Sequence, residues 1–164
     1  MGMNNYLSII TLNVSGLNAS VKRHRIAGWV RKHNPHIRCL QESHLRTKVL
    51  HRLKQIFQAN GQERKAWIAI LTANKIDFKT RSVKRHPEGH CIILKGRIHE
   101  KDINIVSTHA PNTGAPKYIK KILKDFKANI DSNTIIVGDF NTSFSKTDLK
   151  KKISTRILCH FTIP

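Results

Sequence analysis

The sequence has few acidic residues, few cysteines and no long apolar run, and each shortage excludes a class of protein. No apolar stretch approaches the roughly 18 residues that a membrane-spanning helix needs, so no contact with a membrane is expected. The first ten residues lack a positively charged start and a long apolar segment, which argues against a secretory signal peptide. Cys39, Cys91 and Cys159 are far apart and form no CxxC pair, so neither a disulfide framework nor a zinc site is expected. These features predict a protein of the nucleus or cytoplasm that is not secreted.

The charge balance is the strongest property of the whole chain. Thirty lysines and arginines against ten aspartates and glutamates give a formal net charge of +20. A field of this sign attracts polyanions, so we expect a nucleic-acid partner, either DNA or RNA. A solvated basic surface without a specific partner would have the same composition. Charge alone therefore does not separate an enzyme from a passive binder.

Strand-like and helix-like segments alternate along the 164 residues, which predicts a single α/β domain. The segment 46–60 fits two structures: a helix over 49–56, or a hairpin arm that turns at Asn60-Gly61 and pairs with 67–71. No pattern is found in the tail, 149–164. Strands are expected at 7–14, 37–41, 91–98, 103–108 and 134–137, the third and fourth as an antiparallel pair, and helices at 21–33 and 117–131.

Polar side chains with carboxylate, amide or imidazole groups follow the ends of several predicted strands. In layered α/β proteins such strand ends gather into one crevice. Carboxylate and amide oxygens there would form a site for Mg²⁺ or Mn²⁺, and a carboxylate could activate water for phosphodiester hydrolysis. Taken singly, each residue could equally be a turn former, a helix cap or a solvated group. The candidates are Asn13, Glu42, His109, Asn112, Asp139 and Asn141.

Four motifs that occur in a fixed order resemble the endonuclease/exonuclease/phosphatase superfamily. They are Thr11-Leu12-Asn13-Val14-Ser15-Gly16-Leu17, Leu40-Gln41-Glu42-Ser43-His44, Ala110-Pro111-Asn112 and Gly138-Asp139-Phe140-Asn141-Thr142. Further segments are similar to the endonuclease domain that opens the second open reading frame protein of long interspersed elements, which are non-LTR retrotransposons. Those segments are Lys22-Arg23-His24-Arg25, Gln58-Ala59-Asn60-Gly61, Asp77-Phe78-Lys79 and 110–116. The resemblance assigns 1–148 to a truncated domain of this family and leaves 149–164 as an unmatched, poorly ordered tail.

The resemblance implies a fold, a reaction and a role for each candidate residue. The implied fold is part of a four-layer α/β/β/α sandwich of the DNase I type, with the first sheet and its helices largely present and the second sheet incomplete. The implied reaction is Mg²⁺-dependent nicking of one DNA strand, which leaves a 3′-hydroxyl that can prime reverse transcription. Glu42 would be the acidic metal ligand with Asn13 beside the metal, Asp139 would handle the nucleophilic water, Asn141 would hold the scissile phosphate, and Asn112 would lie near the DNA backbone.

The sequence also departs from the family pattern. It contains no Ser-Asp-His triplet and lacks the second active-site aspartate of the family's later half. His109 stands where the family usually has tyrosine, and Trp67 where relatives have glycine. We therefore expect a fragment with little or no activity, monomeric or prone to aggregate through an open apolar sheet face. The alternatives are an active nuclease in which His109 or His160 replaces the lost histidine, a non-enzymatic nucleic-acid binder, and an unfolded product.

Overall fold

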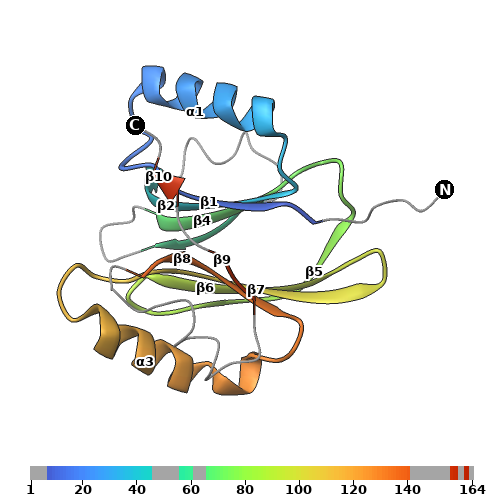
Figure 1. Ribbon diagram of the computed structural model, residues 1–164, viewed down its shortest axis with the longest axis vertical. Helices are drawn as coiled ribbons and strands as arrows, with labels where there is room; N and C mark the ends of the chain where they lie inside the picture. The colour runs from blue at the N-terminus through green and yellow to red at the C-terminus, as the bar shows by residue number, and fades with distance from the viewer. Residues whose placement is uncertain (1–6, 46–55, 61–65, 141–155, 159–160, 163–164) are drawn as a thin grey trace.

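A computed structural model describes residues 7–45, 56–60, 66–140, 156–158 and 161–162, and it has four layers (Figure 1). Two β-sheets face each other, one helix covers the outer face of the first sheet, and a second helix covers the outer face of the other. The elements are β1 (Ile9–Asn13), α1 (Ser20–His33), β2 (Ile37–Leu45), β3 (Ile56–Asn60), β4 (Ala66–Thr72), β5 (Phe78–Arg85), β6 (Cys91–Ile98), β7 (Lys101–His109), α3 (Ala115–Asp125), β8 (Thr134–Asp139), β9 (Arg156–Leu158) and β10 (Phe161–Thr162). The expected α/β/β/α sandwich is confirmed.

The first sheet contains, among the described residues, five strands in the order β10-β1-β2-β4-β3. β1 and β2 run parallel, whereas β4 is antiparallel to both of its neighbours. The hairpin reading of the ambiguous segment is confirmed, since β3 pairs with β4 and Phe57 lies opposite Ile70. Residues 46–55, where most of the alternative helix was considered, lie outside the described residues.

The second sheet also has five described strands, in the order β5-β6-β7-β8-β9, so it is as large as the first sheet, whereas the sequence predicted that it would be incomplete. The antiparallel pair β6–β7 is confirmed, and β8 lies parallel to β7. The inner faces of the sheets bury one shared core, which includes Ile37, Cys39 and Ile70 of the first sheet and Ile92 and Ile105 of the second. Each sheet therefore covers the apolar face that was expected to be open on the other.

Each helix packs an apolar stripe on the outside of one sheet. Ile26 and Val30 of α1 lie in a cluster with the first sheet, and Asn34 ends the helix in the left-handed conformation. α3 stops at Asp125, before the predicted end at 131, and a 3₁₀ helix follows at Lys127–Asn129. No helix in the described ranges is long and apolar enough to span a membrane.

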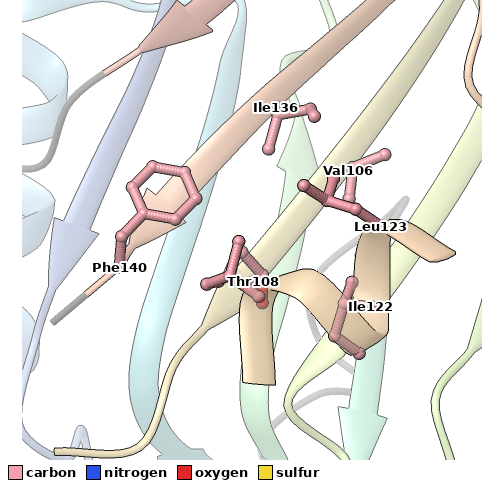
Figure 2. Close-up of a pocket in the computed structure, with 7 residues that line it drawn as sticks. Val106, Thr108, Ile122, Leu123, Ile136 and Phe140 are labelled. Atoms are coloured by element: carbon pink, nitrogen blue, oxygen red, sulfur yellow. The ribbon is translucent and has the colours of Figure 1, made fainter. Parts of the chain in front are cut away.

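The contact between α3 and the second sheet is an apolar packing interface. Figure 2 shows Ile122 and Leu123 of α3 beside Val106 of β7 and Ile136 of β8. The space left between these side chains is about 10 Å³, no more than one water molecule occupies. This space is therefore a packing gap and not a ligand site.

Two short strands come from the tail, for which the sequence showed no pattern. β9 pairs with β8 in parallel, and β10 pairs with β1 so that Phe161 lies opposite Leu12 and Thr162 opposite Asn13. The division of the chain at residue 148 remains a prediction.

Candidate active site

Four strand ends from both sheets meet at one edge of the sandwich. In the parallel pair of the first sheet, Asn13 of β1 lies opposite Gln41 of β2, one residue before Glu42. In the parallel pair of the second sheet, His109 of β7 lies opposite Asp139 of β8. The two pairs are joined across the sandwich, because Nε2 of His109 lies 3.4 Å from Oε1 of Glu42.

Asn13 uses both ends of its amide group to connect the loop after β1 with Glu42. Its Nδ2 donates a hydrogen bond of 3.0 Å to Oε1 of Glu42. Its Oδ1 accepts hydrogen bonds from the backbone N–H of Ser15 (3.0 Å) and from the Ser15 hydroxyl (3.2 Å). Because its oxygen already accepts two bonds, Asn13 orients the carboxylate in this conformation. Its predicted role as a direct metal ligand remains a prediction.

The backbone around Glu42 is strained. Ser15, Glu42 and His44 all have positive φ angles, of 43°, 51° and 47°. β2 continues to Leu45, with a bulge in its pairing with β4 between Gln41 and Leu45. The strand predicted from the sequence ended at Gln41, four residues earlier. Left-handed conformations at non-glycine residues cost about 1 kcal/mol or more each and cluster where a side chain has a function, which supports a functional role for Glu42.

His109 is buried in a group of aromatic and imidazole rings. Its side chain is 8% exposed, and the ring of Trp67 lies nearly parallel to it, with centroids 6.4 Å apart. The ring of His90 is 6.2 Å from that of His109 and 5.1 Å from that of Trp67, and His44 meets Trp67 edge-on at 4.8 Å. The two family departures, at 67 and 109, are thus neighbours in space.

His90 and His44 were not among the predicted site residues. Burial lowers the pKa of His90, the positive charge that His109 can carry lowers it further, and Glu88 opposes these effects. His44 could have been suspected from its place two residues after Glu42. No signal in the sequence marked His90, which lies in a turn before β6.

Gly138 explains why Asp139 can lie beside His109. Its φ angle is +140°, and a Cβ atom added to it would lie 1.8 Å from the carbonyl oxygen of Thr108. Only glycine allows β8 to approach β7 this closely. The backbone N–H of Ala110 then donates a hydrogen bond of 2.8 Å to the carbonyl oxygen of Asp139.

The structure thus brings three of the predicted site residues into contact and places a fourth beside them. Asn13, Glu42 and His109 are joined directly, and Asp139 is the register neighbour of His109. Asn112 is exposed in the loop between β7 and α3, outside these contacts. Asn141 lies outside the described residues.

The donor set suits a hard cation that keeps much of its hydration. Among the described residues, no group of three or more histidine, cysteine, aspartate or glutamate side chains is arranged to enclose an ion. Glu42 is nevertheless 28% exposed at the strand ends, and Asn13 fixes one of its oxygens. Mg²⁺ is commonly bound through one or two carboxylates together with water and substrate phosphates, so these residues fit it.

Solved structures with the same fold include nucleic-acid enzymes. TDP2 of D. rerio, in a complex with a single-stranded DNA product, superimposes with a TM-score of 0.65 at 16% identity, covering 87% of this chain and 64% of that protein. The endonuclease domain of TRAS1, a telomere-specific non-LTR retrotransposon, superimposes with a TM-score of 0.61 at 17% identity. The match covers 85% of this chain and 61% of that domain. An endonuclease/exonuclease/phosphatase family protein of Bacteroides thetaiotaomicron superimposes with a TM-score of 0.61 at 13% identity. The match covers 90% of this chain and 66% of that protein.

At these identities the similarities establish the fold, and the chain spans 61–66% of the length of the three proteins. Membership follows from the sequence itself. The model of the endonuclease/exonuclease/phosphatase family matches residues 10–158, a range that includes every residue of the site described above. With that match and the four-layer sandwich together, this chain belongs to the endonuclease/exonuclease/phosphatase family.

Proposed function

We propose that this chain carries the metal-binding part of a divalent-metal-dependent DNA endonuclease that hydrolyses a phosphodiester bond and nicks one strand. The observation that carries the proposal is that Glu42 contacts both Asn13 and His109. These contacts lie at the strand ends where Asp139 is the register neighbour of His109. A buried imidazole, an oriented carboxylate and a second carboxylate at one edge are the groups that such a hydrolysis needs.

Each residue has a role that follows from its atoms. Glu42, held by Asn13, would bind Mg²⁺ or Mn²⁺, which when bound supplies positive charge next to the phosphate oxygens and the leaving oxygen. Asp139 would orient or deprotonate the attacking water. His109 offers Nε2 as a donor to a phosphate oxygen. Asn141 would hold the scissile phosphate, and Asn112 would contact the DNA backbone.

The choice of DNA as substrate rests on charge and on motifs. The net charge of +20 favours binding of a polyanion. The motifs quoted above favour an endonuclease of the long interspersed element type, and one structural relative is the endonuclease domain of a non-LTR retrotransposon. We therefore propose that the nick serves retrotransposition and that the chain works in the nucleus, where chromosomal DNA is present.

We further propose that these 164 residues alone hydrolyse DNA weakly or not at all. They contain no Ser-Asp-His triplet, which in the family pattern stabilises the transferred phosphate. Groups that act as one catalytic unit fail together when one is removed, so a loss of several orders of magnitude is expected.

The test measures binding of metal and DNA together with nicking. The affinity of a fluorescein-labelled duplex is compared in Mg²⁺ and in EDTA at constant ionic strength, and nicking of supercoiled plasmid is followed in parallel. We expect Mg²⁺ to raise the affinity and Glu42→Gln to abolish that gain. The matched control is Glu100→Gln, which neutralises an exposed carboxylate in the β6–β7 turn and should keep the gain. Rapid nicking that depends on Glu42 and Asp139 would refute the weak-activity part of the proposal.

A non-enzymatic basic nucleic-acid-binding protein is the second candidate, and the charge excess favours it. This function predicts DNA binding that weakens steeply with salt but is indifferent to Mg²⁺ and to Glu42→Gln. The same measurements therefore decide between the two.

A further inference from the structure

A hollow of about 310 Å³ lies between the loop after β1 and the start of α1. This volume is at the lower end of the range that small-molecule sites occupy. Asn13, whose amide orients Glu42, is one of the residues that line the hollow, so the hollow borders the candidate active site. Its described lining residues are Asn13, Val14, Ser15, Ala19, Val21, Lys22, Arg25 and Ile26.

The hollow is positively charged and contains no described acidic side chain. Lys22 and Arg25 lie one helical turn apart on α1 and both line it. Nζ of Lys22 donates a hydrogen bond of 2.9 Å to the carbonyl oxygen of Ser15. This acceptor is a neutral backbone group, so it does not neutralise the charge of Lys22. Neither cation forms an ion pair within the described ranges, and the first turn of α1 contains no acidic residue. The hollow therefore attracts an anion.

The rim of the hollow is apolar as well as basic. Val21 is 69% exposed, and in the described part of the chain it is the one large hydrophobic side chain that is exposed. It lines the hollow next to Lys22. An inorganic anion would gain nothing from contact with Val21, whereas the sugar or base of a nucleotide would. Two cations and an exposed apolar side chain together fit a ligand with a phosphate and an apolar face.

We propose that this hollow is a nucleotide subsite, which binds the nucleotide next to the scissile phosphate of the DNA strand. Lys22 and Arg25 engage its phosphate, and Val21 packs against its sugar or base. The position of this nucleotide next to the cleaved bond rests on the proposed function, but its binding in the hollow requires no hydrolysis.

The loop geometry couples the subsite to the metal site. Asn13 holds Ser15 through its Oδ1 and Glu42 through its Nδ2, and the backbone N–H of Gly16 donates to the carbonyl oxygen of Glu42 at 2.6 Å. A nucleotide bound against this loop is therefore separated from the Glu42 carboxylate by the side chain of Asn13. Binding there fixes the register of the strand relative to Glu42.

The test compares two double variants on the same helix that remove the same charge. One is Lys22→Gln with Arg25→Gln. The matched control is Arg31→Gln with Lys32→Gln, two exposed residues of α1 that do not line the hollow. Affinity for a fluorescein-labelled DNA duplex is measured in EDTA over a range of salt, so that no step depends on metal. Thermal unfolding by circular dichroism checks that both variants are folded.

We expect the affinity of the first double variant for DNA to fall about tenfold or more. The slope of log affinity against log salt concentration should become less steep by about one to two units. The control should lose about threefold or less. Val21→Ser should weaken binding with the salt slope unchanged, since it removes an apolar contact. In the wild type, titration with the dinucleotide pdTdT should shift the backbone amide resonances of Ser15, Val21 and Lys22.

Equal losses in the two double variants, or amide shifts that map elsewhere, would overturn the subsite. Failure of the proposed function looks different. In that case Glu42→Gln would not alter Mg²⁺-dependent binding, while the difference between the two double variants in EDTA would remain.

Discussion

Nε2 of His109 in β7 lies 3.4 Å from Oε1 of Glu42 in β2, so a single pair of side chains joins the two sheets at the candidate active site. The same carboxylate oxygen accepts a hydrogen bond from Asn13. The imidazole and the amide therefore hold Glu42 from two sides, one from each sheet. This arrangement makes the position of Glu42 sensitive to changes in either half of the sandwich.

A double-mutant cycle of Glu42→Gln and His109→Gln tests this contact. We expect a coupling energy of about 0.5–1 kcal/mol, at the lower end for contacting residues because Glu42 is partly exposed. Stability is measured by urea unfolding of the four proteins. The control cycle is Asp77→Asn with Lys79→Gln, an exposed ion pair with atoms 3.5 Å apart, which should show a smaller coupling. Additive effects of the His109 and Glu42 changes would contradict the contact.

Gly138 is predicted to be essential for the pairing of β7 with β8. Gly138→Ala places a methyl group 1.8 Å from the Thr108 carbonyl oxygen at a φ of +140°, so β8 must move away. We expect a loss of stability of about 1–3 kcal/mol or more, measured by denaturant unfolding. The matched control is Gly28→Ala in α1, where an added Cβ meets nothing within 4 Å.

Gly28→Ala should be neutral or stabilising by about 0.5–1 kcal/mol, because alanine is the better helix former. A Gly138→Ala protein as stable as the wild type would show that β7 and β8 do not approach as closely as described.

The core strands could be predicted from the sequence because their apolar runs leave few alternatives. The runs at 91–98 and 134–137 are β-branched and bounded by polar turns, and both are strands. The hairpin at 56–72 could be chosen once Asn60-Gly61 was given weight over the helical spacing of the segment before it. In each case the local pattern and the tertiary structure agree.

β5 could not be found this way, because its sequence, Phe-Lys-Thr-Arg-Ser-Val-Lys-Arg, hides its apolar positions among exposed basic residues. Among the described strands it lies at the edge of its sheet, where lysine and arginine protect against aggregation and where pairing with β6 decides the structure. β9 and β10 have three and two residues and no signal of their own. These two segments become strands because they pair with β8 and β1, and no local sequence pattern indicates that pairing.

The sequence predicted some residues of the candidate site but not the contacts between them. Strand-end spacing and the family motifs identified Asn13, Glu42 and His109. That Trp67 and His90 would pack against His109 depends on how the two sheets face each other, which spacing along the chain does not specify. The bulge at Glu42 likewise depends on the pairing of β2 with β4.

Cys39 and Cys91 are predicted to be unreactive in the folded protein. Both side chains are fully buried, and burial raises the pKa of each thiol to about 12. Only the thiolate reacts with iodoacetamide, so at pH 8 labelling should be slower than in urea by orders of magnitude. Mass spectrometry of the two cysteine peptides after timed labelling measures this. Rapid native labelling of Cys39 would mean that the core between the two sheets opens readily.

The stability of the fold should fall as the pH is lowered below about 6.5, and His90 should contribute to this fall. Burial lowers the pKa of His90 in the folded state, and the nearby His109 and His86 lower it further against an opposing effect of Glu88. The unfolded state keeps a histidine pKa of about 6.5 and therefore binds more protons than the folded state below that pH. Stability then decreases as the pH falls from about 6.5 towards the folded-state pKa, and it is fully present above 6.5.

His90→Gln tests this assignment, because it removes the titrating group while the backbone carbonyl that accepts the His109 N–H remains. We expect the variant to lose less stability than the wild type between pH 7.5 and pH 5.5, as measured by urea unfolding at each pH. His24→Gln, an exposed histidine of α1, serves as the control and should follow the wild type. If His90→Gln loses as much stability on acidification as the wild type, then His90 is not held in its neutral form by the rings that surround it.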